Sequence, residues 1–107
     1  MTYTPRRYAL VKAICQSELT EQQFREVIEQ SLRTCFGELG LCSIDPKIIR
    51  FDVASSAGIV SCEQNAVNEL ETALSLVTEY SRADLTLLTL RVSGTIRGIR
   101  KGAKQSF

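Results

Sequence analysis

The chain ends in a run of positive side chains of the kind that contact a polyanion. From residue 91 onward there are five cations and no Asp or Glu: Arg91, Arg97, Arg100, Lys101 and Lys104. They follow the small residues Ser93-Gly94-Thr95, and Thr95 can cap a short helix. On such a helix the cations from residue 97 onward share one face, which predicts phosphate contacts that position a polyanion without reading its sequence. A solvated tail is the alternative, because Gly98 and Gly102 weaken a helix.

Charge is segregated along the sequence. Residues 1–12 carry +3 and residues 91–107 carry +5, which leaves −7 for the middle of a chain whose net charge is +1. Basic ends on an acidic body favour contact with nucleic acid, although a charge run is also what a solvated face shows.

Length and composition limit the class of protein. We expect residues 1–107 to form one domain with a basic tail at about 93–107, and no apolar run is long enough to cross a bilayer. The N-terminus lacks the apolar region of a secretory signal, so we expect a cytoplasmic protein, or a nuclear or nucleolar one in a eukaryote. There is no histidine, and the cysteines at 15, 35, 42 and 62 form no Cys-x-x-Cys pair. We therefore expect free, mostly buried thiols, with no metal or other cofactor bound by the protein.

The first half of the sequence predicts a strand followed by a helix. Residues 7–15 are mostly apolar on both faces, which is typical of a central strand. Thr20 and Gln23 match a capping box, and Leu19 with Phe24 matches a hydrophobic staple. One apolar stripe then recurs at helical spacing until Gly37 or Gly40 ends the helix: Phe24, Val27, Ile28, Leu32, Cys35 and Phe36.

The second half predicts an edge strand at 47–53, a hairpin partner at 59–62, a helix at about 65–80 and a final strand at 85–92. This order of elements indicates an α+β protein, because it runs strand, helix, strand, strand, helix, strand. The fold it predicts is a ferredoxin-like, RRM-like sandwich with a four-stranded antiparallel sheet and both helices packed on one face. In that topology the last strand lies beside the first, so the basic tail meets Arg6 and Arg7.

The same fold serves several functions, and the residues separate some of them. The strand at 59–62 has no aromatic residue, so base stacking on the sheet is not expected. The loop after Cys15 has no glycine, unlike the phosphate loop of an acylphosphatase. A small-ligand-binding regulatory domain remains open. The outer face of the sheet is predicted to contact a protein partner through apolar residues: Ile59, Leu88 and Leu90, with Ser61 beside them.

Several strings together resemble one known family. They are Ala-Gly-Ile-Val-Ser-Cys at 57–62, Ala-Leu-Ser-Leu-Val-Thr-Glu-Tyr at 73–80 and Thr-Leu-Arg-Val-Ser-Gly-Thr-Ile-Arg at 89–97, together with Arg7-Tyr8 and the glycines at 37 and 40. The chain from about Arg7 to Lys101 resembles the small RNA-binding protein subunit of archaeal and eukaryotic ribonuclease P, the protein component 2 family.

The resemblance implies a non-catalytic subunit with no active site of its own. Such subunits help a catalytic RNA, which holds the magnesium, to remove the 5′ leader of precursor tRNA. They contact the RNA's catalytic domain, meet precursor tRNA only indirectly and pair with a larger barrel-fold protein subunit. A homodimer within a heterotetramer is one implied assembly, and no membrane is involved. The RNA contacts carried over to this sequence are Arg6, Arg7, Arg91, Thr95, Arg97, Arg100, Lys101 and Lys104.

Overall fold

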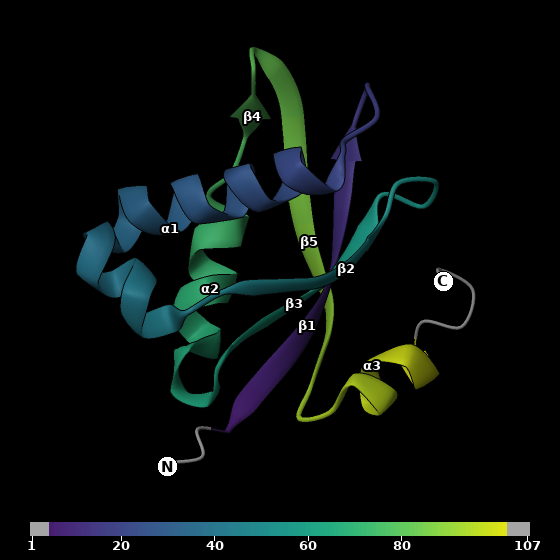
Figure 1. Ribbon diagram of the computed structural model, residues 1–107. Helices are drawn as coiled ribbons and strands as arrows, with labels where there is room; N and C mark the ends of the chain where they lie inside the picture. The colour runs from purple at the N-terminus through teal and green to yellow at the C-terminus, as the bar shows by residue number, and fades with distance from the viewer. Residues whose placement is uncertain (1–4, 103–107) are drawn as a thin grey trace.

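The computed structural model describes the backbone of residues 5–102 and the side chains of residues 5–99 (Figure 1). Its centre is a five-stranded antiparallel sheet with the strand order β2-β3-β1-β5-β4. The strands are β1 (Arg6–Cys15), β2 (Lys47–Asp52), β3 (Ala57–Glu63), β4 (Glu79–Tyr80) and β5 (Ala83–Ser93). The helices of the described chain are α1 (Glu21–Ile44), the 3-10 helix η1 (Gln64–Ala66), α2 (Val67–Ser75) and α3 (Ile96–Gly102). No described helix is both long and apolar enough to span a membrane.

β1 lies in the middle of the sheet, as its two apolar faces predict. It pairs antiparallel with β3 on one side and with β5 on the other. In the β1–β5 ladder Tyr8 lies opposite Ser93 and Leu10 opposite Arg91, so the beginning of the first strand adjoins the end of the last. The prediction that these two basic segments meet is therefore confirmed.

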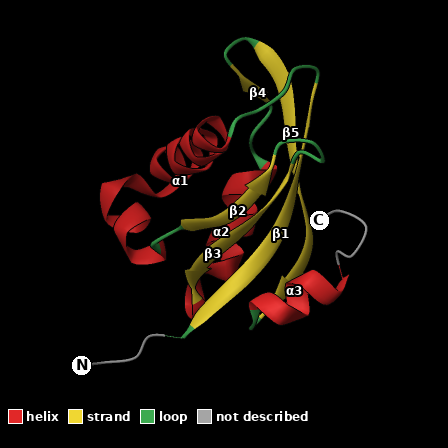
Figure 2. Cartoon of the chain, turned by 45° about the vertical axis from the view of Figure 1, so that its right-hand side comes forward, coloured by secondary structure: helices red, strands yellow, loops and turns green. Residues whose placement is uncertain are grey.

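The two faces of the sheet are covered differently (Figures 1 and 2). α1 and α2 pack on one face and enclose the main core, to which β1 contributes Ala9, Val11 and Ala13. α3 packs on the opposite face against Leu10 and Ile59. The prediction that both long helices share one face is therefore confirmed, and the short helix α3 lies on the other face because its apolar residue Ile99 is buried there.

α1 begins where local signals predict. Thr20 Oγ1 accepts from the Gln23 amide at 3.2 Å, and Gln23 Oε1 accepts from the Thr20 amide at 3.0 Å, which completes the capping box. Gly37, with φ of 75°, interrupts the helix with a kink. The first part of the predicted stripe is buried, whereas Phe36, just before the kink, is exposed. Beyond the kink the helix continues to Ile44, which is again buried in the main core. Gly37 therefore bends α1 and does not end it, so the predicted end at Gly37 or Gly40 is wrong.

The second long helix is shorter than its predicted span of 65–80. α2 ends at Ser75, and the chain then forms β4, which makes the sheet five-stranded where four strands were predicted. Ser81 and Arg82 both have positive φ and form the two-residue loop between β4 and β5. Ser-Arg lacks the Asn-Gly or Asp-Gly signature of that turn, so the hairpin gave no sequence signal.

Candidate nucleic-acid interface

The loop before α3 is held by its own side chains. Thr95 Oγ1 accepts a hydrogen bond from the Gly98 amide at 3.0 Å, and the Thr95 amide donates to Ser93 Oγ at 3.2 Å. The carbonyl of Thr95 also accepts from the Ile99 amide at 3.3 Å. Thr95 is thus the N-cap of a short helix, as the sequence predicts.

Two glycines allow close contacts at this loop. A Cβ atom at Gly94 would lie 2.5 Å from Arg7 Nη1, so the Arg7 guanidinium lies directly against this part of the backbone. A Cβ atom at Gly98 would overlap Ser93 Oγ. The first turn of α3 is therefore packed closely against the end of β5, with Arg7 beside it.

α3 is anchored to the sheet by one apolar side chain. Ile99 is fully buried and packs in a small cluster with Leu10, Ala57 and Ile59, next to Tyr8. Ile59 was predicted to line an exposed partner surface, and this is wrong because α3 covers it. Ser61, predicted beside it, is also buried. Burial on both faces makes β3 part of the interior, which the sequence of β3 alone did not show.

The predicted cations lie mainly around this docked helix. Arg91 and Arg97 are exposed, as is Thr95, and within residues 5–99 neither arginine forms an ion pair. Arg7 is half-buried against Gly94. The backbone of Arg100 and Lys101 belongs to α3, but their side chains, like all of Lys104, lie outside the described residues.

Arg6 is held by hydrogen bonds and an ion pair within the chain. Its Nη1 pairs with Asp45 Oδ2 at 2.8 Å, its Nη2 donates to the Asp45 carbonyl at 2.6 Å, and its Nε donates to Ser61 Oγ at 2.6 Å. Asp45 is the C-cap of α1, so Arg6 ties the end of α1 to the sheet. The charge of Arg6 is therefore offset within the chain by Asp45, and its predicted RNA contact stays a prediction.

Two further cations share the face that α3 covers. Residues opposite each other in a ladder point to the same side, and Arg50 lies opposite Ile59 while Lys12 lies opposite Leu88. Lys12 Nζ donates to the Ser55 carbonyl at 2.6 Å. Neither was among the predicted contacts. For Lys12 the sequence did carry a signal of this role, because Lys12 is a cation that interrupts an otherwise apolar face of β1.

Beside the cations lies an exposed apolar area. Leu88 is 42% exposed, Leu90 is 52% exposed and Ile14, on the neighbouring strand, is 51% exposed. Leu90 lies in a bulge, because Leu10 pairs with Arg91 and Val11 with Thr89. These two leucines of the predicted partner surface are therefore accessible, whereas Ile59 is not.

The four cysteines differ in burial. All four are free thiols; Cys62 is buried, Cys15 and Cys35 are half-buried, and Cys42 is exposed. Burial raises the pKa of Cys62 to about 11, so its thiol stays protonated at neutral pH. Within the described residues, no three His, Cys, Asp or Glu side chains are grouped closely enough to hold a metal ion.

Comparison with known proteins identifies the family. The family model described as Rpp14/Pop5 matches residues 7–104, which is nearly the whole chain. The chain belongs to the Rpp14/Pop5 family. Ribonuclease P protein component 2 of Pyrococcus horikoshii is 35% identical over 95 residues, a match that covers 89% of this chain and 79% of that protein. The protein of the same name from Methanocaldococcus jannaschii is 27% identical over 92 residues, covering 86% of this chain and 67% of the relative.

The Rpp14/Pop5 fold also occurs in a solved assembly. A chain in the cryo-EM structure of yeast ribonuclease MRP aligns with a TM-score of 0.73 over 98% of this chain and 95% of that chain. The identity is 10%, so this likeness concerns the fold alone. A chain with the same fold is therefore present within a ribonuclease MRP structure.

Proposed function

We propose that this protein is a non-catalytic, RNA-binding subunit of ribonuclease P that helps a catalytic RNA to remove the 5′ leader of precursor tRNA. One observation carries the proposal beyond family membership. The first and last strands are neighbours, so Arg7, Arg91 and the docked helix with Arg97 form one surface. We call this surface the α3 surface: Arg7, Arg91, Thr95 and Arg97, to which the proposal adds Arg100 and Lys101 as further residues of α3.

The α3 surface acts by electrostatics. Where strands of a folded RNA converge, phosphates repel each other, and a fixed group of guanidinium and ammonium ions reduces that repulsion. Arg91 and Arg97 have no carboxylate partner within residues 5–99, so their charge is available to phosphate. Less magnesium is then needed for the RNA to fold. The magnesium and the chemistry belong to the RNA, and the protein binds no cofactor of its own.

The sheet face on the side of α3 offers a place for a protein partner. We assign the exposed apolar area of Leu88 and Leu90, extended by Ile14, to the contact with a larger barrel-fold subunit or with a second copy in a heterotetramer. It adjoins the α3 surface, so a partner bound there would stand next to the RNA.

The strand order β2-β3-β1-β5 supports the finer assignment of a ferredoxin-like, RRM-like fold to which β4 is an addition. We expect the assembly to work in the cytoplasm, or in the nucleus of a eukaryote.

Salt-dependent RNA binding tests the proposal. The full chain is titrated with a transcript of an archaeal ribonuclease P catalytic domain at several salt concentrations. We expect the logarithm of affinity to fall linearly with the logarithm of salt concentration. Replacing Arg97, Arg100 and Lys101 by alanine should weaken binding and lower that slope by about one for each phosphate that the variant no longer neutralises.

The matched control removes three cations from elsewhere. Arg25, Arg33 and Arg82 lie on α1 and in the β4–β5 turn, away from the α3 surface. Their replacement by alanine should change affinity much less. Affinity that is flat with salt, or that falls equally in both triple variants, would contradict the proposed surface.

A further inference from the structure

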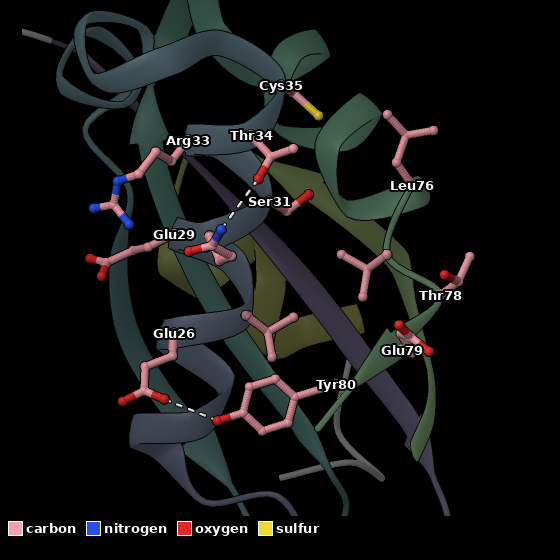
Figure 3. Close-up of a pocket in the computed structure, with 13 residues that line it drawn as sticks. Glu26, Glu29, Ser31, Arg33, Thr34, Cys35, Leu76, Thr78, Glu79 and Tyr80 are labelled. Atoms are coloured by element: carbon pink, nitrogen blue, oxygen red, sulfur yellow. Dashed lines mark hydrogen bonds between the residues drawn. The ribbon is translucent and has the colours of Figure 1, made fainter. Parts of the chain in front are cut away.

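A groove with a different chemistry lies on the helical side of the molecule (Figure 3). It runs between α1 and the segment 76–80, which leads from α2 into β4, and encloses about 740 Å³. α1 and α2 cover the face of the sheet opposite α3 (Figure 1). The groove therefore opens away from the α3 surface.

Carboxylates dominate the charge around this groove. Glu26 and Glu29 line it from α1, and Glu79 lines it from β4. Arg33 is the one cation among the lining residues, and its Nε bonds to Glu38 Oε1. The surplus charge of the groove is therefore negative, which repels phosphate and excludes RNA as its occupant.

Between the carboxylates the groove is apolar. Val27 is buried at its base, Cys35 and Val77 are half-buried, and Leu76 is 61% exposed at its rim. An exposed leucine beside a concave apolar surface is suited to an aliphatic side chain of a partner. The negative charges at both walls would then lie on either side of that side chain.

Two hydrogen bonds hold the walls in place. Tyr80 Oη donates to Glu26 Oε2 at 3.0 Å and links β4 to α1, as Figure 3 shows. This bond to the carboxylate raises the pKa of Tyr80 above its ordinary value. Ser31 Oγ donates to the Ala73 carbonyl at 2.6 Å and links α1 to α2. The groove is therefore preformed, which lowers the entropy lost on binding.

We propose that this groove binds a lysine- or arginine-rich segment of a partner protein, with one or two aliphatic side chains seated between its charges. The cations of the segment face Glu26, Glu29 and Glu79, and its aliphatic group packs on Val77 and Leu76. Because the groove and the α3 surface lie on opposite sides of the sheet, protein segment and RNA can be bound together. The inference does not rest on the ribonuclease P function, since it depends only on the charge and shape of the groove.

A defined peptide tests the groove directly. The blocked peptide Lys-Lys-Leu-Leu-Lys-Lys is titrated into the ¹⁵N-labelled full chain, and amide shifts are followed by NMR. We expect saturable shifts that include Val27, Gln30 and Thr78, from the two walls of the groove. A peptide with both leucines replaced by glycine, and one with glutamate in place of lysine, should bind about tenfold more weakly or not at all. Shifts confined to other surfaces, or equal affinity for all three peptides, would overturn the proposal.

Matched charge reversals separate the groove from general acidity. Glu29→Lys with Glu79→Lys should weaken peptide binding about tenfold, whereas Glu18→Lys with Glu71→Lys, outside the groove, should leave it nearly unchanged. Equal losses in the two variants would overturn the proposal. If the lysine variant of the groove fails to fold, Glu29→Gln with Glu79→Gln is measured instead, with the same two outcomes. RNA affinity, measured in parallel, should not fall in either groove variant.

Discussion

Single residues at the end of β5 hold the cations in position without carrying charge themselves. Ser93 Oγ accepts from the Thr95 amide, and Thr95 Oγ1 accepts from the Gly98 amide, so each fixes the backbone that follows. Gly98 leaves the space that Ser93 occupies. The backbone on either side of Arg97 is therefore held by three small residues: Ser93, Thr95 and Gly98.

Gly98→Ala should disturb this arrangement. The new methyl group would overlap Ser93 Oγ and lie 3.2 Å from both Ser93 Cβ and Thr95 Oγ1. Ser93 can rotate away only by giving up its bond to the Thr95 amide. We expect a loss of about 1–3 kcal/mol in unfolding free energy, typical of overpacking, together with weaker RNA binding. Chemical denaturation and an RNA titration measure the two effects.

A double-mutant cycle provides the control. In a Ser93→Ala background the overlapping hydroxyl is absent, so Gly98→Ala should cost less there than in the original chain. Strictly additive losses would show that the cost of Gly98→Ala does not come from its contact with Ser93.

Residue roles that depend on neighbours in sequence were predictable, and those that depend on distant partners were not. The Thr95 cap lies within three residues of the amide it accepts from, and its sequence signal is local. Arg6 has its partner at Asp45, 39 positions away, which nothing in the local pattern indicates. Ile59 was placed on an exposed face because the docking of Ile99 over it, 40 positions later, is a tertiary contact.

The same distinction applies to whole elements. α1 has a capping box at its start and an apolar stripe along its first part, and both were read correctly. α2 was extended too far because Val77 and Tyr80 continue its apolar spacing, yet they serve the linker and β4 instead. Periodicity alone does not separate a helical turn from a short strand, since both place apolar residues on the core side.

The packing of α1 makes a prediction about stability. Leu32 is fully buried in the main core, so Leu32→Ala removes buried methyl groups and leaves a cavity. We expect a loss of about 2–5 kcal/mol in unfolding free energy, measured by urea denaturation. Leu39→Ala on the same element is the control, because Leu39 is 85% exposed and should change stability little. Equal effects of the two substitutions would contradict the assigned burial.

At the scale of the molecule, the sheet separates two kinds of surface. Arg91, Arg97 and the Arg7 guanidinium lie at the end of β5 and around α3, and the acidic groove opens on the side of α1 and α2. The segregation of charge along the chain was visible in the sequence. Its distribution between two faces was not, because that depends on α3 crossing to the side opposite the other helices.

This separation predicts that the α3 surface can be disrupted without loss of the main core. Ile99→Asn keeps every cation but places a polar group among Leu10, Ala57 and Ile59, which favours release of α3 from the sheet. The main core lies on the opposite face, so the unfolding free energy should fall by only about 1–3 kcal/mol. RNA affinity should nevertheless drop, because the same charges are no longer held together.

Leu32→Ala supplies the opposite case, since it weakens the main core and leaves α3 docked. At a temperature where both variants are folded, Ile99→Asn should bind RNA less tightly than Leu32→Ala, even though Leu32→Ala is the less stable protein. Circular dichroism gives the stability and an RNA titration the affinity. If affinity instead follows stability across the two variants, the docking of α3 does not organise the RNA surface, and the cations act wherever the chain carries them.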